Sequence, residues 1–182
     1  MLRLNFMLYM LVLLCSLLLS GCGGSEPESH YPAIKNFQLE RYLGKWYEIA
    51  RLENAFEQGL NNVSVDYSID EADRIRFKAQ SLLVAADEWQ LKSGILNVVS
   101  DEHIGQFTLS LDKTTNTDYT ILYVDSDYQY ALVTAGQGDY LWIMSRAPTL
   151  GPSISRILIN KARGLGFPVN KLVFIDQNRP NR

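Results

Sequence analysis

The side chains that could carry out chemistry are few in this sequence and lie far apart. The chain has two cysteines, Cys15 and Cys22, and two histidines, His30 and His103. A tetrahedral zinc site or a disulfide framework needs more of these residues at repeated spacings. The chain also has no Gly-x-Ser-x-Gly segment and no phosphate-binding glycine loop, so neither an activated serine nor a nucleotide site is indicated. The sequence therefore predicts neither an enzyme nor a bound cofactor or metal.

The one compact group of acid–base residues is Asp101-Glu102-His103. Neighbours in an extended chain point in different directions, so three adjacent residues do not converge on one point. A solvated turn is the preferred interpretation, and a metal or acid–base site is the alternative. Haem binding is a further alternative, which would require His103 to face inward as an axial ligand.

The composition favours one domain that does not bind nucleic acid. The chain has 182 residues, with 17 Lys and Arg against 20 Asp and Glu, for a net charge of −3. This length suits a single globular domain. A protein without a positive surface lacks the charge that neutralises a row of phosphates.

The N-terminus has the pattern of a secretory leader, predicted over residues 1–21. Arg3 precedes an uncharged stretch of 14 residues, Phe6 to Leu19, which is short of the roughly 20 apolar residues that cross a bilayer. The segment Leu19 to Cys22 resembles the lipobox of bacterial lipoproteins, which implies a diacylated Cys22 at the mature N-terminus and attachment to a membrane. Gly23 stands where an Asp favours inner-membrane retention in such lipoproteins, so the resemblance implies the outer membrane.

A flexible tether is predicted to follow, so that residues 22–34 form the acylated N-terminus and its linker and residues 35–182 form the folded domain. Gly23 to Pro32 consists mainly of Gly, Ser, Glu and Pro, which contribute little to a core.

The body of the chain alternates apolar and polar residues in short segments, which is typical of strands with one face on a core. Turn residues separate eight such segments, and no helical pattern lies between them. This spacing predicts an all-β, eight-stranded antiparallel up-and-down barrel. The strands are expected near residues 46–52, 63–69, 75–79, 89–99, 107–111, 119–124, 130–135 and 140–144.

One amphipathic helix and a ninth strand are expected after the barrel. Apolar residues from Ile154 to Leu165 follow helical spacing, with Thr149 or Ser153 as a start cap and Gly164 or Gly166 at the end. The apolar stripe of this helix needs a surface to cover, most simply the outer wall of the barrel. Residues 171–176 are expected to form the ninth strand.

Two segments near opposite ends of the domain resemble the lipocalin family. The first is Tyr42 to Arg51, which contains Gly44-Lys45-Trp46 and matches the Gly-x-Trp start of the first lipocalin strand. The second is Asp139 to Pro148, which matches the closing strand and carries Arg146. The resemblance implies that Arg146 packs across the Trp46 indole, a cation–π contact worth about 0.5 to 2 kcal/mol. Gly44, Trp46 and Arg146 are thus expected to be structural.

A third family block, usually Thr-Asp-Tyr, lies between the sixth and seventh strands. Thr117-Asp118-Tyr119 matches this motif residue for residue but precedes the predicted sixth strand. Asp125-Ser126-Asp127-Tyr128 lies at the expected position between the sixth and seventh strands. The resemblance spans residues 37–177. It is greatest to bacterial outer-membrane lipoprotein lipocalins, with apolipoprotein D and plant temperature-induced lipocalins as relatives.

Strand alternation also nominates the residues that face the inside of the barrel. Those opposite charged neighbours are Tyr67, Ile75, Phe77 and Ala79; Arg74, Arg76 and Lys78 are expected to face solvent. Resemblance to apolipoprotein D implies that Tyr67 and Trp142 line the ligand pocket, and the same alternation adds Tyr140 and Met144. Alternatively, each of these aromatic residues is part of the core or of the outer wall.

The resemblance and the predicted membrane anchor together imply a carrier of fatty acids or lysophospholipids. Its role would be lipid transport, storage or envelope maintenance, with no covalent step. Two alternatives remain open: a lipid-transforming enzyme, and a structural envelope lipoprotein whose barrel is filled by side chains. A second copy of the chain, in a homodimer, is a further candidate partner.

Overall fold

The structure is a computed structural model that describes residues 30–99, 101–111 and 114–179. The predicted leader and Cys22 lie outside the described residues. Within the described ranges no helix has both the length and the apolar character needed to span a bilayer.

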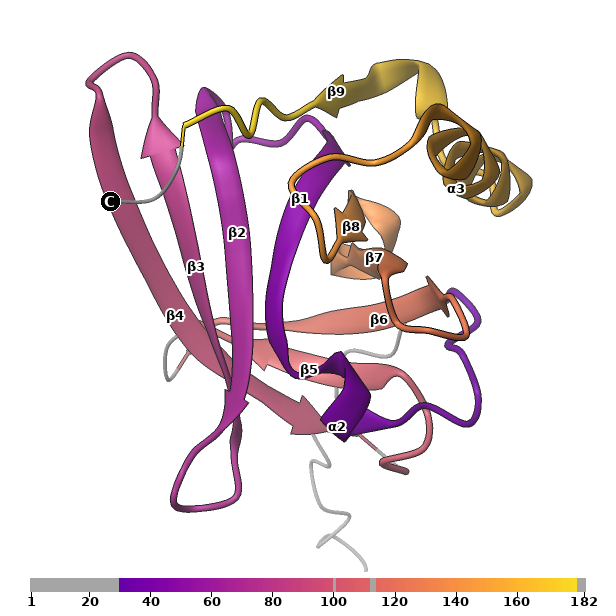
Figure 1. Ribbon diagram of the computed structural model, residues 1–182. Helices are drawn as coiled ribbons and strands as arrows, with labels where there is room; N and C mark the ends of the chain where they lie inside the picture. Colours follow the sequence, from indigo (N-terminus) through magenta and orange to yellow (C-terminus); the bar gives the residue numbers. More distant parts are fainter. Residues whose placement is uncertain (1–29, 100, 112–113, 180–182) are drawn as a thin grey trace, which may run out of the picture.

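Eight antiparallel strands form a closed barrel, as the sequence predicts (Figure 1). Each strand pairs with the next one along the chain, and the N-terminal half of β1 pairs with β2 while its C-terminal half pairs with β8, which closes the sheet. The alternation of apolar and polar residues places one face of each strand inside. The strands are β1 (Gly44–Leu52), β2 (Leu60–Ile69), β3 (Ile75–Leu83), β4 (Glu88–Val98), β5 (Gln106–Ser110), β6 (Asn116–Val124), β7 (Tyr130–Ala135) and β8 (Tyr140–Ser145).

The turn between β6 and β7 is held by one aspartate. Asp125 Oδ1 accepts hydrogen bonds from the backbone N–H groups of Gln129 (2.6 Å) and Tyr130 (2.8 Å). Asp and Asn favour such turns because their side-chain oxygens can accept hydrogen bonds from backbone N–H groups that the strands leave free. Residues 125–128 therefore occupy the place expected for the third sequence block, whereas residues 117–119 lie within β6.

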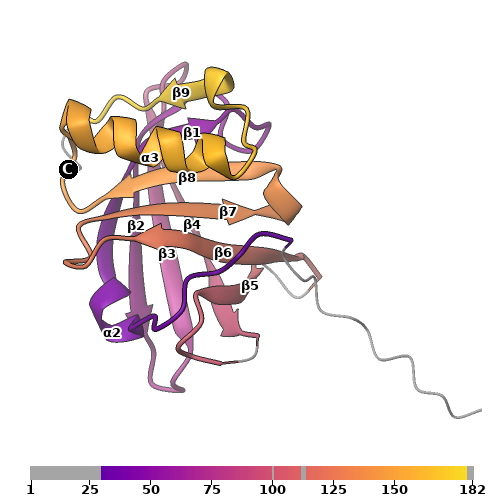
Figure 2. The same cartoon turned by 90° about the vertical axis from the view of Figure 1, so that its right-hand side faces the viewer.

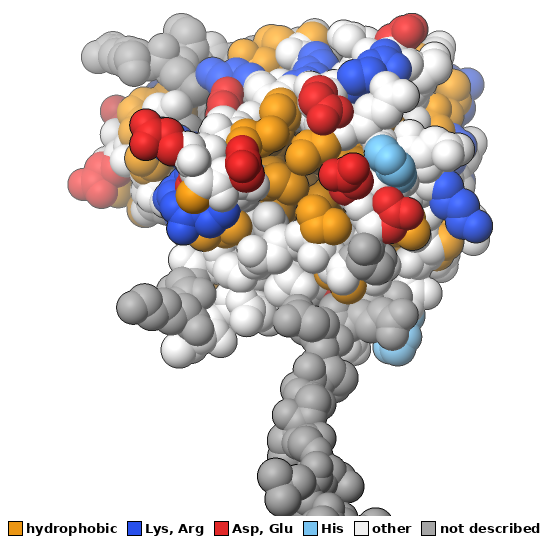
Figure 3. All heavy atoms as spheres, turned by 90° about the horizontal axis from the view of Figure 1, so that it is seen from below, with side chains coloured by type: hydrophobic (Ala, Val, Ile, Leu, Met, Phe, Trp, Pro, Cys, Tyr) orange, Lys and Arg blue, Asp and Glu red, His pale blue; other side chains and the backbone are white. Residues whose placement is uncertain are grey.

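One end of the barrel is closed by the short helix α2 (Leu39–Tyr42) and the residues around it. Phe37, Tyr42 and Trp46 are buried there, and their rings pack against one another inside the barrel. Figure 3 shows the outer surface of this closed end, where hydrophobic side chains gather in the centre and charged side chains surround them.

The C-terminal helix α3 (Pro152–Gly164) lies across the outside of the barrel over β7 and β8 (Figure 2). Its buried residues Leu158 and Ala162 cover the outer wall. The helix begins at Pro152, after Gly151, and no side chain caps it, so neither Thr149 nor Ser153 has the predicted role. Pro suits this position because its missing N–H is not needed in the first turn. Gly166 follows the helix with a φ of 92°, which is the left-handed conformation expected there.

Two further segments cover parts of the barrel wall. Strand β9 (Leu172–Phe174) follows the short helix η2 (Val169–Lys171) and pairs with the C-terminal part of β1. The second segment is the N-terminal part of the domain. Tyr31 stacks on Phe167 with 4.6 Å between ring centres, and the Ile34 N–H donates to Ile121 O (2.9 Å). The chain thus packs on the barrel from Tyr31, four residues before the predicted domain start.

Candidate ligand-binding site

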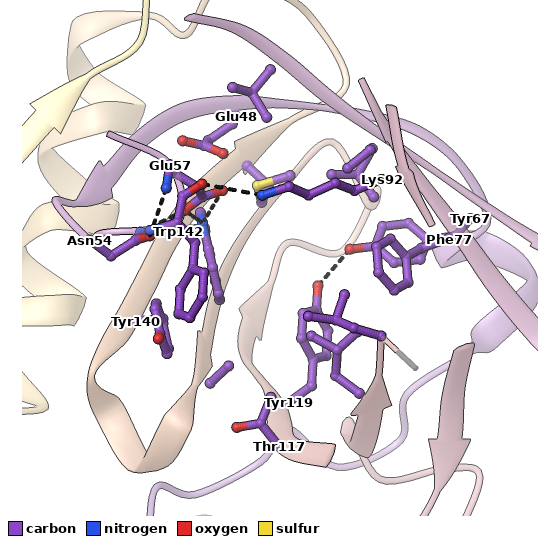
Figure 4. Close-up of a pocket in the computed structure, with 18 of the residues that line it drawn as sticks. Glu48, Asn54, Glu57, Tyr67, Phe77, Lys92, Thr117, Tyr119, Tyr140 and Trp142 are labelled. Atoms are coloured by element: carbon purple, nitrogen blue, oxygen red, sulfur yellow. Dashed lines mark hydrogen bonds between the residues drawn. The ribbon is translucent and has the colours of Figure 1, made fainter. Parts of the chain in front are cut away.

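The barrel encloses a cavity of about 310 Å³ at the end opposite α2 (Figure 4). This volume is at the lower end of the range for sites of small organic ligands. Most of its wall is apolar or aromatic, while polar side chains lie around its mouth. The lining side chains come mainly from β2, β3, β6 and β8 and from the β1–β2 and β5–β6 loops, and the central ones include Val63, Val65, Phe77, Leu109, Tyr119 and Trp142.

Six of the seven side chains predicted to face a ligand line this cavity: Tyr67, Phe77, Ala79, Tyr140, Trp142 and Met144. Ile75 shares the inward face of β3, but it pairs with Ile69 beside the β2–β3 turn and is buried in the core near the closed end. It does not line the cavity. Ligand contact by the other six remains a prediction.

Three tyrosine hydroxyls meet at the inner end of the cavity. Tyr67 Oη and Tyr119 Oη are 2.7 Å apart, and Tyr42 Oη lies 3.5 Å from Tyr119 Oη. All three residues are buried, and this desolvation raises their pKa values, that of Tyr42 to about 12. The hydroxyls therefore stay neutral, and each forms a hydrogen bond with another hydroxyl in apolar surroundings.

The mouth of the cavity is bounded by the loop between β1 and β2. Glu57 in this loop accepts hydrogen bonds from Trp142 Nε1 (3.0 Å) and from Asn54 Nδ2 (2.6 Å). The Trp142 ring in turn stacks on Tyr140, with 5.7 Å between ring centres and 6° between planes. Glu57 therefore fixes both the loop and the indole that forms one wall.

A buried contact between Arg51 and Glu48 supports this loop from beneath. Arg51 Nη1 lies 2.8 Å from Glu48 Oε1, and both side chains are 2% exposed. Arg51 Nη2 also donates to the backbone carbonyls of Glu57 and Leu60. Burial, together with repulsion from Glu57, raises the pKa of Glu48 from 4.5 to about 8, although Arg51 opposes the shift. Arg51 thus joins β1 to the loop and to the first residue of β2.

The charged residues that were predicted to face solvent lie outside the cavity. Arg74 and Arg76 pair with Asp70 at the β2–β3 turn, and Lys78 is exposed. Glu102 and His103 are exposed in a turn, with 4.0 Å between His103 Nε2 and Glu102 Oε1. Because His103 does not line the cavity, it does not have the inward position that a haem ligand needs.

Several cavity residues were absent from the sequence prediction. Val63 and Val65 share the inward face of β2 with Tyr67, so strand alternation carried the signal for them. Tyr119 lies on β6, from which the sequence analysis nominated no residue. Glu48 and Lys92 had no such signal, because charged side chains were assumed to face solvent. Glu57 lies in a loop, where alternation predicts nothing.

The geometry defines a class of protein: a closed antiparallel barrel that holds one small apolar ligand between a sealed end and an open end. The packing of Arg146 on Trp46 adds the predicted closing contact, with 3.9 Å from the guanidinium carbon to the ring centre. Residues 37–177 match the family model described as a lipocalin-like domain, so the chain belongs to the lipocalin family.

Curated relatives and solved structures agree with this assignment. The chain is 34% identical over 167 residues to the outer membrane lipoprotein Blc of Vibrio cholerae, covering 91% of this chain and 96% of the relative. It is 32% identical over 160 residues to the protein of the same name from Citrobacter freundii, covering 88% and 90%. The structure of insecticyanin from Manduca sexta superimposes with a TM-score of 0.65 at 15% identity, covering 83% of this chain and 87% of that one, which shows the fold alone.

Proposed function

We propose that this lipocalin binds fatty acids or lysophospholipids in the barrel cavity while it is anchored to the outer membrane. The observation that carries the proposal is the apolar cavity, which is sealed by Trp46 and Arg146 at one end and bounded by polar side chains at the other. Such a site suits a ligand with an apolar chain and a polar head.

Binding would be a partition between lipid and protein. Removal of the acyl chain from water contributes about 25 cal/mol for each Å² of apolar surface. Tyr67, Phe77, Ala79, Tyr140, Trp142 and Met144 form the wall that this chain would contact. The proposed role needs no nucleophile and no covalent step, so we propose a carrier and not an enzyme.

The proposed anchor is the acylated Cys22, which follows the predicted leader. Two or more acyl chains give stable membrane attachment, whereas one gives only reversible binding. The names of the Vibrio and Citrobacter relatives support an outer-membrane location, and Gly23 after the cysteine is consistent with it. Transport, storage and envelope maintenance are all roles for such a protein.

The test is a titration of the purified, delipidated protein with a fatty acid and a lysophospholipid, followed by intrinsic tryptophan fluorescence. Saturable binding of at least one lipid is the expected result. An intact fold that binds neither would overturn the proposal and favour the structural lipoprotein with a filled barrel. Turnover of a bound lipid, detected by mass spectrometry, would favour the lipid-transforming enzyme. Sedimentation of the same sample measures whether the chain forms a homodimer.

A further inference from the structure

Lys92 has an unusual place for a charged residue on a barrel strand. It lies on β4 on the same face as Gly94 and Leu96, and that face is inward because Leu96 is buried in the core and an added Gly94 Cβ would meet the Phe77 ring. Lys92 lines the cavity, and Figure 4 shows its side chain reaching across the mouth towards Glu57. Its Nζ donates to the backbone carbonyl of Phe56, 3.2 Å away.

The carboxylates at the mouth already have other partners. Glu48 pairs with Arg51, and Glu57 accepts hydrogen bonds from Trp142 and Asn54. None of the ion pairs in the described part of the chain includes Lys92. Lys92 is also the only cationic side chain among the described residues that line the cavity. The mouth therefore has one ammonium group without a carboxylate partner.

A neutral carbonyl is a weaker partner for an ammonium group than an anion, because an anion adds the attraction between opposite charges to the hydrogen bond. A lipid whose chain fills the cavity would present its head at the mouth, where Lys92 lies. The side-chain oxygens of Glu48 and Glu57 would not pair with a positively charged head, since donors of the protein already bind them. Glu57 belongs to no ion pair either, but Trp142 and Asn54 bind its carboxylate. Among the described residues that line the cavity, Lys92 is therefore the one cation with which an anionic head could pair.

We propose that Lys92 binds the anionic head of the ligand, a carboxylate or a phosphate, and so determines which lipids the cavity holds. The inference rests on the proposed lipid-binding function and specifies the chemistry of its ligand. The ammonium group would exchange the Phe56 carbonyl for the anion, and the other two donors of the same group remain available.

The experiment compares three probes with the same chain and different heads: dodecanoate, dodecyl phosphate and dodecanol. Each is titrated into the delipidated wild-type protein at a pH where both acids are ionised. The variants are Lys92→Gln, which keeps a hydrogen-bond donor but no charge, and Lys92→Arg, which keeps the charge. Lys78→Gln is the matched control, because it removes one lysine from the neighbouring strand β3 at an exposed position.

We expect Lys92→Gln to weaken binding of the anionic probes about fivefold to tenfold, as for loss of a partly screened charged hydrogen bond, and to leave dodecanol binding unchanged. Lys92→Arg and Lys78→Gln should bind all three probes as the wild type does. A loss confined to one anion identifies that head as the one recognised, and a loss of both supports the shared anionic class.

The outcomes separate this inference from the function on which it rests. If the wild-type protein binds none of the probes, the carrier function fails. If it binds dodecanol but neither anion, or if Lys92→Gln affects anions and dodecanol equally or affects none of them, the role of Lys92 is overturned. The salt dependence of wild-type binding is a second measurement that needs no variant: affinity for dodecanoate should fall with added salt while affinity for dodecanol should not.

Discussion

The guanidinium group of Arg146 lies over the indole ring of Trp46, 3.9 Å from its centre, and seals one end of the barrel. The same group donates to the backbone carbonyls of Lys45 (2.8 Å) and Arg41 (2.7 Å), and its Nε donates to Tyr128 O (3.2 Å). One side chain from the end of β8 thus joins the start of β1, helix α2 and the β6–β7 turn.

Arg146→Met should lower the free energy of unfolding by about 2 to 3 kcal/mol, because it removes the cation–π contact and leaves three carbonyl groups without this donor. Urea unfolding measures the change. Arg156→Met, at an exposed position of α3, is the control and should alter stability by less than about 0.5 kcal/mol. Equal effects of the two substitutions would show that Arg146 does not hold this end together.

Gly94→Ala should destabilise the barrel by about 1 to 3 kcal/mol, as expected for overpacking. A Cβ at this position would lie 2.4 Å from Ser110 O and 2.5 Å from the Phe77 ring. Since Phe77 lines the cavity, its displacement should also weaken ligand binding. Thermal unfolding and lipid titration measure the two effects. For Gly164→Ala, no atom beyond the adjacent residues and the nearby backbone of its own helix lies within 4 Å of the new Cβ, so the substitution should be neutral or stabilising. An unchanged melting temperature for Gly94→Ala would contradict the packing described.

Glu48→Gln should alter how stability depends on pH. The pKa of Glu48 is raised from 4.5 to about 8 by burial and by Glu57, against the effect of Arg51. Between these values the folded chain holds a proton that the unfolded chain has released. Stability should therefore fall as pH rises through this window, by up to about 1.4 kcal/mol for each pH unit, and level off above the folded pKa.

Urea unfolding at several values from about pH 5 to about pH 8 tests this expectation. The difference between wild type and Glu48→Gln should change steadily in favour of the variant as pH rises, because glutamine does not titrate. Other groups titrate in both proteins and cancel in the difference. Parallel pH profiles would mean that Glu48 stays ionised beside Arg51.

Trp142→Phe should remove most of the tryptophan fluorescence change that accompanies lipid binding. Trp142 lines the cavity, whereas Trp46 is buried at the closed end and Trp89 does not line the cavity. The substitution also removes the donor to Glu57, so affinity should fall, though by less than about tenfold, as for loss of one hydrogen bond. Competition with a fluorescent fatty acid measures affinity independently. A fluorescence change that persists in full would place the ligand away from Trp142.

The sequence by itself determined the strands, their order and the inward faces, because alternation is a local property of an extended chain. It also indicated the closing contact between Trp46 and Arg146, through two segments that resemble one family. Six predicted wall residues line the cavity for the same reason: Tyr67 and its counterparts lie on the inward faces of β2, β3 and β8.

Only the tertiary structure decided how deep each inward residue lies and which charged side chains line the cavity. Ile75 has the right face but lies near the closed end, since depth depends on register and pairing across the sheet. Glu48 lies inside because Arg51, three residues away, can pair with it there, whereas Lys92 stays exposed and lines the mouth, because β4 crosses the mouth at that position. These placements depend on contacts between distant strands, which the local pattern of one strand does not contain.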